Sequence, residues 1–190
     1  KQNEEKALVL SYNKIHTYNL CPKQYMYSHE WNLQTIRIGG MEYGNNVHII
    51  LETIIRTIKD GIQLDLINVN QIIDKKWRNK NFRNDDENEK FKKIATSQIL
   101  ICIENLKPLL NKKNIISVEE EFNSINENHL ITGRFDAVFE NEKTKVIIDF
   151  KTGDEKDYLD QMSFYSLCLS EKYPNQNIKT AIYYLKTGKL

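Results

Sequence analysis

The sequence predicts an α/β domain in which helices cover both faces of a mixed central sheet, an α/β/α arrangement with a helical insert at about residues 62–112. Apolar residues recur at helical spacing through most of the first 110 residues, and the period then changes to short β-branched and aromatic runs. The 190 residues, 40% of them hydrophobic, are close to the usual size of one domain and can bury a sizeable core. We therefore expect a single domain over residues 1–190.

The first half of the chain is predicted to be helical. Apolar and aromatic residues at helical spacing in residues 11–27 predict two short helical turns, broken near Pro22. Residues 43–59 carry a continuous apolar face that ends at Asp60-Gly61, which predicts an amphipathic helix. Two more helices, predicted at residues 70–79 and 89–110, are separated by the polar residues 84–88 and form the insert.

The second half is predicted to contain the sheet. Three β-branched and aromatic runs, at residues 115–122, 130–139 and 145–150, predict a meander whose hairpin loops are Asn126-Glu127-Asn128 and Asn141-Glu142-Lys143. Helical spacing returns at residues 158–171, and residues 181–185 predict a last strand. The helices at 43–59 and 158–171 must then cover the two faces of the central strands.

Charge and hydropathy narrow the class of protein. The formal net charge is only +1, so any contact with nucleic acid must use a local patch rather than a global field. The chain has no apolar run of about 18 residues and no apolar stretch near its start, as a membrane span or a signal peptide would require. We expect a soluble intracellular protein, cytoplasmic or associated with the nucleoid, with an organelle as the remaining alternative, and no membrane contact.

The cysteines and the two ends of the chain add two expectations. Cys21, Cys102 and Cys168 are an odd number at wide spacings, which fits neither a disulfide framework nor a zinc site and suits a reducing compartment. The sequence begins with lysine rather than methionine, and little follows the last predicted strand. We therefore expect the chain to be a piece of a longer protein.

Two acids and a lysine form the strongest functional signal. Asp136 lies on one predicted strand, and Asp149 and Lys151 lie at the end of the next. Side chains alternate faces along a strand, so Asp149 and Lys151 point to one side while Ile148 and Phe150 point to the other. Buried charges must be paired or bound to metal.

This pattern suits phosphodiester hydrolysis. Two carboxylates on neighbouring strands can hold Mg²⁺, and a lysine two residues from a metal ligand can orient or activate water and stabilise developing charge. A lone Asp-x-Lys is nevertheless a weak signal, because most such pairs are ordinary salt bridges at strand ends. From these three residues alone, both interpretations stay open.

Further motifs in the same order resemble those of the RecB-like family of PD-(D/E)xK nucleases, over nearly the whole chain. That family includes nuclease domains of recombination helicase-nucleases, domains fused to UvrD-like helicases and CRISPR-associated adaptation nucleases. The resemblance implies a restriction-endonuclease-like fold. It rests on the motifs Gly44-Asn45-Asn46-Val47-His48, Gly133-x-x-Asp136, Asp149-Phe150-Lys151-Thr152-Gly153 and Gln161-x-x-x-Tyr165.

The resemblance also implies roles for residues. It makes Asp136, Asp149 and Lys151 catalytic, and it makes His48, Asp136 and Asp149 ligands of Mg²⁺, for which Mn²⁺ could substitute. It implies that Gly44 lets a helix pass close to the site and that one glutamate of a neighbouring run adds to the acidic cluster. Candidate DNA contacts are Gln161, Tyr165 and Arg134, and the glutamate run is Glu119-Glu120-Glu121, of which the sequence cannot select the member that faces the site.

Individually, several of these residues have ordinary explanations. On its own, His48 would be a core or surface histidine, and the pair Gln161 and Tyr165 would be a solvated glutamine beside a core tyrosine. A basic and aromatic stretch at residues 75–83 could bind nucleic acid, but a solvated helix face is the favoured interpretation. In iron–sulfur members of the family, a cysteine placed like Cys21 joins three cysteines after the last strand. This chain lacks that trio, so we expect no cluster.

The implied function is a metal-dependent DNA nuclease, an exonuclease in DNA repair, recombination or processing. Its substrate would be DNA, single-stranded DNA included, and its partner a helicase domain in the same or another chain. The alternative is a catalytically silent nuclease-like domain that binds DNA or docks to a helicase. A docking domain has no physical need for acids, a histidine and a lysine that converge, so the sequence favours the nuclease.

Overall fold

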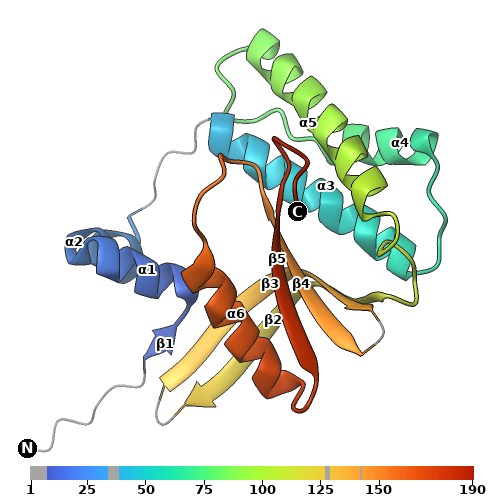
Figure 1. Cartoon of the computed structure of the whole chain (residues 1–190). Coiled ribbons are helices and arrows are strands. Elements are labelled where there is room, and N and C mark those ends of the chain that lie inside the picture. The colour runs from blue at the N-terminus through green and yellow to red at the C-terminus, as the bar shows by residue number, and fades with distance from the viewer. Residues whose placement is uncertain (1–7, 34–38, 127–128, 142) are drawn as a thin grey trace, which may run out of the picture.

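The computed structural model describes residues 8–33, 39–126, 129–141 and 143–190. A five-stranded mixed sheet forms its centre, with one long helix and the insert on one face and a single helix on the other (Figure 1). The elements are β1 (Val9–Leu10), α1 (Tyr12–Leu20), α2 (Pro22–Tyr25), the π-helical turn η1 (Met26–Glu30), α3 (Gly39–Lys59), α4 (Leu66–Lys76), α5 (Asp85–Leu106), β2 (Ile115–Asn126), β3 (His129–Asn141), β4 (Thr144–Lys151), α6 (Leu159–Lys172) and β5 (Asn177–Tyr184).

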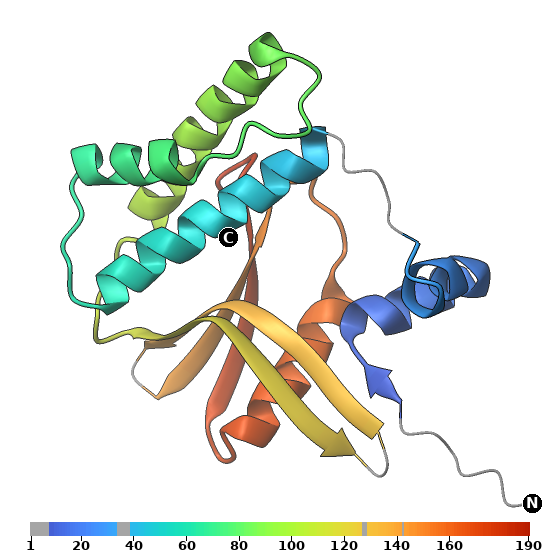
Figure 2. The ribbon, with the colours of Figure 1, turned by 180° about the vertical axis from the view of Figure 1, so that it is seen from behind.

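The long helix α3 lies across the sheet and contributes more buried side chains to the first core than any other element. Its apolar stripe, with Val47, Ile50 and Ile54 fully buried, packs against Ile148 and Phe139 of the sheet and against α4 and α5. Val and Ile have a lower helix propensity than Ala or Leu, so burial of this stripe in the core, rather than propensity, stabilises the helix. Figure 2 shows α3 between the insert and the sheet.

The second core lies on the opposite face, under α6. Leu169 and Cys168 of this helix pack on Phe135, Val138 and Ile147 of the sheet. Helices therefore cover both faces, and the predicted α/β/α arrangement with a mixed sheet is confirmed.

The order of the strands creates a gap at the centre of the sheet. One edge of β3 pairs with β2 along its length, and the other edge pairs first with β1, at Val9↔Leu130 and Leu10↔Ile131, and later with β4. The antiparallel pairing of β3 with β4 runs from Asn141↔Thr144 to Ala137↔Ile148 and goes no further in the described part of the chain. On this edge, residues 132–136 of β3 therefore pair with neither β1 nor β4.

The predicted boundaries of both insert helices were wrong: each helix begins four residues earlier and ends three or four residues earlier than expected. The polar residues 84–88, predicted as a separator, mostly belong to α5: Asn84 is its N-cap, with Oδ1 accepting from the Glu87 amide at 2.8 Å. Acidic side chains in the first turn are stabilised by the positive end of the helix dipole, so this polar run starts a helix. The other insert helix begins at Leu66, earlier than predicted, because Asp65 and Asn68 form a capping box.

Near the amino-terminal end, a two-residue strand that the sequence pattern missed fixes the first helix to the sheet. The predicted break at Pro22 is present between α1 and α2, and Ser11 caps α1 by accepting from the Lys14 amide. β5 begins at Asn177, four residues before the predicted start. β2 and β3 pair up to Asn126↔His129, as a hairpin requires, but positions 127, 128 and 142 of the predicted loops lie outside the described residues. Within the described chain, no helix is both long and apolar enough to cross a membrane.

Candidate active site

Asp136 lies in the gap of the sheet, where β3 has left β4. Its Oδ2 accepts a hydrogen bond from the backbone amide of Phe150 at 2.8 Å and lies 3.4 Å from Nδ1 of His48. The carboxylate thus takes the place of a ladder partner for β4. Burial alone would raise the pKa of Asp136, but His48, the Phe150 amide and Lys151 together lower it, so this carboxylate is charged at neutral pH.

Asp149 and Lys151 share one face at the end of β4, as strand alternation predicts. Nζ of Lys151 lies 2.7 Å from Oδ2 of Asp149, an ion pair whose alignment does not satisfy that oxygen as a hydrogen-bond acceptor. Ile148 and Phe150 face the core below α3. Burial, followed by the charge of Asp136, raises the pKa of Asp149 to about 6. A buried acid with such a pKa is a frequent sign of a functional site.

His48 and Glu119 complete an acidic cluster around Asp136. One potential ligand atom from each of these three residues lies within 4.8 Å of the other two. Burial lowers the pKa of His48, but the hydrogen bond and charge of Asp136, with the charges of Asp149 and Glu119, raise it above the usual value. Glu119 itself has a raised pKa, because of burial and the charge of Asp136. Like charges held this close need a cation or protons.

The sequence could not select Glu119 from its run of three glutamates. Its φ of +50° lies in the left-handed region, and the β2–β3 register passes from Val118↔Ala137 to Glu120↔Phe135 without pairing it. The register itself does not shift here, so the left-handed backbone places Glu119 beside Asp136 and His48 of α3. Glu120 pairs instead with Lys172, and Glu121 is exposed. A left-handed residue breaks strand alternation, so periodicity alone carries no signal for it.

The glutamine and tyrosine of α6 are tied into the site. Gln161 is only 6% exposed; its Oε1 accepts from Lys151 Nζ at 3.0 Å, and its Nε2 lies 3.3 Å from Asp149 Oδ1 and 2.9 Å from the Tyr165 hydroxyl. The interpretation of a solvated glutamine was therefore wrong. Gln161 holds both the acid and the lysine in place.

Arg134 is placed at the rim rather than in the cluster. Its side chain is 61% exposed, and its Nε forms an ion pair with Glu119 Oε2 at 2.5 Å. An exposed guanidinium beside the acids could exchange this partner for a phosphate, since Arg forms bidentate contacts with both groups.

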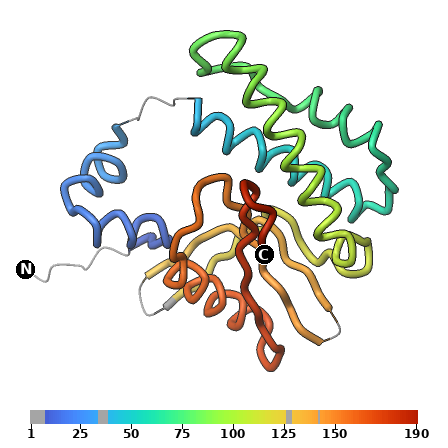
Figure 3. Tube along the Cα trace, turned by 45° about the horizontal axis from the view of Figure 1, so that its top comes forward, coloured from blue at the N-terminus to red at the C-terminus, as the bar shows by residue number. Residues whose placement is uncertain are grey.

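A cavity of about 540 Å³ joins these residues. His48, Asp136, Asp149 and Lys151 line it together with Gly133 and Arg134 from the gap in the sheet. Its rim is built from α1, through residues such as Tyr12 and His16, and from the segment 156–158 before α6. Figure 3 shows α1 and α6 lying next to each other on this side of the sheet. The contribution of α1 was not predicted, because it depends on the two-residue pairing of β1 with β3.

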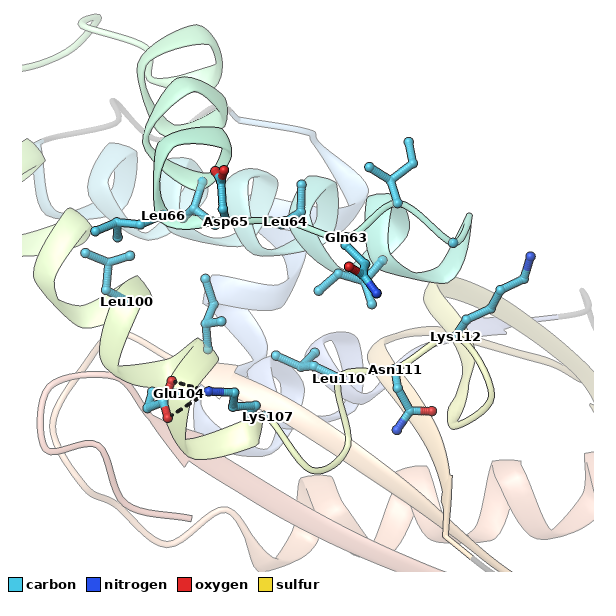
Figure 4. Close-up of a pocket in the computed structure, with 15 residues that line it drawn as sticks. Gln63, Leu64, Asp65, Leu66, Leu100, Glu104, Lys107, Leu110, Asn111 and Lys112 are labelled. Carbon is cyan, nitrogen blue, oxygen red and sulfur yellow. Dashed lines mark hydrogen bonds and ion pairs between the residues drawn. The ribbon is translucent and has the colours of Figure 1, made fainter.

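A larger cavity of about 680 Å³ lies in the insert, between the carboxyl-terminal ends of α3 and α5 and the start of α4 (Figure 4). It contains none of the predicted site residues, and two of its charged lining groups, Glu104 and Lys107, pair with each other. The basic stretch 75–83 is also structural in part, since Trp77 stacks on Phe82 and donates from Nε1 to Asn88. Both observations leave the acidic cluster as the candidate active site.

Gly44 brings α3 close to the catalytic strand. A methyl group added at Gly44 would lie 3.2 Å from Oγ1 of Thr152, the residue after Lys151. The close approach implied by the motif is therefore present.

A mixed sheet with acids and a lysine at a split between two strands defines the restriction-endonuclease-like class of proteins. A family model described as the PD-(D/E)XK nuclease superfamily matches residues 9–190, and the chain belongs to this superfamily. It is therefore a nuclease by family, and PD-(D/E)XK nucleases use divalent metals.

Other comparisons add little. No curated protein matches the sequence. The chain is similar to a crystal structure of protein VC1899 from Vibrio cholerae, with 13% sequence identity and a TM-score of 0.35. The match covers 76% of this chain and 43% of the Vibrio protein, so the chain spans less than half the length of that protein.

Proposed function

We propose that this chain is a Mg²⁺-dependent deoxyribonuclease that hydrolyses phosphodiester bonds at Asp136, Asp149 and Lys151. The observation that carries the proposal is the convergence in one cavity of a buried acid of raised pKa, its paired lysine, Asp136 and His48, with Glu119 beside the last two. A structural salt bridge at a strand end does not need the second acidic group.

The motifs similar to those of RecB-like domains support a finer assignment. By that likeness the chain is an exonuclease in DNA repair, recombination or processing, and it works inside the cell, with a helicase domain in the same or a partner chain. DNA is the proposed substrate, and Gln161, Tyr165 and Arg134 are the proposed contacts to it. We also propose the single domain at residues 1–190 with its insert at about 62–112.

The residues of the cluster fit a divalent cation. Carboxylate oxygens of Asp136 and Glu119 are the ligands that Mg²⁺ prefers, and the His48 nitrogen leaves room for Mn²⁺. Asp149 lies beside this trio, and its Oδ2 lacks an aligned hydrogen-bond donor, so it remains available as a ligand. A bound cation neutralises these charges, polarises the scissile phosphate and makes water a stronger acid.

The side chains then divide the remaining work. Lys151, held by Asp149 and Gln161, orients the attacking water and stabilises negative charge that develops on the phosphate. Tyr165, held by Gln161, and Arg134 at the rim position the strand. The oxygen of water bonds to phosphorus, and the bond between phosphorus and the leaving oxygen breaks. Water releases one proton and the leaving oxygen takes up one, so the step balances.

Cleavage of end-labelled DNA tests the proposal. We expect cutting with Mg²⁺ or Mn²⁺ and none with EDTA, and we expect Lys151→Ala to lower the rate at least about a hundredfold, because it removes charge stabilisation at the phosphate. Lys179→Ala is the matched control, because Lys179 is exposed on β5 outside the site. Single-stranded and duplex substrates, labelled at either end, report strand preference and polarity.

An absence of cutting by folded protein that still binds Mg²⁺ would contradict this function and favour the silent DNA-binding or docking domain. Equal loss in Lys151→Ala and Lys179→Ala would also contradict the assigned role of Lys151.

Tyr158 is expected to position Lys151. The Lys151 Nζ lies 4.7 Å from the centre of the Tyr158 ring, which is a cation–π contact. We expect Tyr158→Ala to lower the rate of cleavage about fivefold with little change in KM, since a freed lysine spends less time oriented toward water. Tyr158→Phe keeps the ring and should cut like the unmodified protein; equal defects in both variants would show that the ring is not what matters.

A further inference from the structure

An aromatic pair on α1 stands at the rim of the catalytic cavity. Tyr12 and His16 lie one helical turn apart, and their rings stack with centroids 5.5 Å apart and planes 20° apart. Both residues line the same cavity as Asp136, Asp149 and Lys151. The whole helix α1 contains no buried residue, and His16 is exposed. Core packing therefore does not account for His16, and Tyr12 touches the second core at its edge, through Phe164.

The pair is held in a fixed relation to the catalytic strand. β1 pairs with β3 at Leu10↔Ile131, five residues before Asp136, and Thr132 Oγ1 lies 3.4 Å from the Leu10 carbonyl. Ser11 then caps the first turn of α1, and the Tyr12 ring contacts that of Phe164 on α6. The strand that carries Asp136 thus also positions the aromatic rim.

We propose that Tyr12 and His16 form a stacking platform for an unpaired nucleobase next to the scissile phosphate, so that α1 selects single-stranded over duplex substrate at this site. The inference rests on the proposed nuclease function. Aromatic side chains stack on bases of any sequence, but only where the face of a base is exposed. In a duplex both faces are covered by neighbouring base pairs, so a paired strand gains nothing from the platform.

The surroundings of the pair agree with this occupant. The cavity of about 540 Å³ has the size of a small-ligand site, which suits a single nucleotide rather than a stack of base pairs. The exposed Lys156 also lines this cavity and could neutralise a phosphate of the same strand. Bases would then meet α1 while the backbone runs toward Lys156 and the acids.

Binding of labelled oligonucleotides, measured by fluorescence anisotropy with Ca²⁺ in place of Mg²⁺, tests the platform apart from cleavage. The probes are a thymidine homopolymer, a blunt duplex, and an oligomer of the same length made of abasic deoxyribose phosphate. The variants are Tyr12→Ala, Tyr12→Phe and His16→Ala. Tyr18→Ala is the matched control, since Tyr18 lies on the same helix, is 55% exposed and packs on Tyr25 instead.

We expect Tyr12→Ala and His16→Ala to weaken binding of the thymidine strand about tenfold, as loss of one stacked base implies. Tyr12→Phe and Tyr18→Ala should bind like the unmodified protein, and no variant should change binding of the duplex or the abasic oligomer. If Tyr12→Ala loses its thermal unfolding transition, His16→Ala decides, because His16 is exposed.

The results separate the platform from the nuclease function. Unchanged binding of the thymidine strand, or equal weakening for the abasic oligomer, would overturn the platform even if the protein cuts DNA. Base-dependent weakening in a protein that never cuts with Mg²⁺ would support the platform and overturn the proposed function alone.

Discussion

Asp149→Asn is expected to lower the rate of cleavage about 10³-fold while making the metal-free protein more stable. Asp149 is 4% exposed, and burial beside Asp136 raises its pKa from 3.8 to about 6. At neutral pH the folded protein therefore carries a charge that it would be more stable without. Removal of that charge should raise the free energy of unfolding by about 1–3 kcal/mol, since one pKa unit corresponds to about 1.4 kcal/mol. For a chain of this size the melting temperature should rise by several degrees.

The pH dependence gives the sign of this effect. Because the folded-state pKa of Asp149 is raised, the folded protein binds more protons than the unfolded chain between about pH 4 and pH 6. The stability of the metal-free protein should therefore fall as pH rises through that window. Above about pH 6 the destabilisation caused by Asp149 is complete and no longer changes with pH. In Asp149→Asn this part of the pH dependence should be absent, and the two proteins should differ least near pH 4.

Mg²⁺ should reverse the order of stability. A cation that binds only the folded state raises the melting temperature of the unmodified protein, and the variant should gain less because it has lost a proposed ligand. The rate of cleavage should fall about 10³-fold. Asp74→Asn is the control, since Asp74 is 71% exposed and pairs with Lys92 outside the site. Asp149 would lose its assigned role if the variant cut DNA normally or melted below the unmodified protein in EDTA.

The sequence predicted the catalytic strand well because alternation is a local rule. Val146 to Ile148 lead into Asp149, and the one-residue alternation that buries Ile148 and Phe150 forces Asp149 and Lys151 onto the other face. The helix α3 could be predicted equally well, since its apolar residues recur every three to four positions. Such patterns depend only on residues close in sequence.

What the sequence could not predict depends on pairings between distant residues. Glu119 enters the site through an unpaired position with a left-handed backbone, and its two neighbours in the run look the same by type. Tyr12 reaches the cavity only because two residues of β1 pair with β3, about 120 positions later in the chain. A two-residue strand has too short a pattern to recognise, so the whole aromatic rim remained outside the predicted site.

Gly133→Ala is expected to lower the stability of the protein strongly, although it adds a single methyl group to a strand position that lines the site. Gly133 pairs with Phe122 across β2 and β3, and a methyl group at Gly133 would overlap the Phe122 ring. That ring is 6% exposed and stacks on Phe135 with centroids 4.6 Å apart, so it has little room to move. Overpacking of this kind costs about 1–3 kcal/mol, which should lower the melting temperature by several degrees.

The same overlap should reach the site. Phe135 also contacts the edge of Tyr165, with centroids 5.4 Å apart, and Tyr165 holds Gln161 through its hydroxyl. A displaced Phe122 ring therefore shifts the aromatic layer beneath the glutamine that orients Lys151. We expect the rate of cleavage to fall together with stability.

A compensating substitution makes the prediction sharp. Phe122→Leu removes the ring atoms that a methyl group at Gly133 would overlap, so the double variant should be more stable than the sum of the two single losses implies. Gly40→Ala is the control, because a methyl group at Gly40 meets no atom within 4 Å and alanine favours the helix. If both glycine variants melted alike, or if the two losses at Gly133 and Phe122 simply added, the ring would not be what requires glycine on this strand.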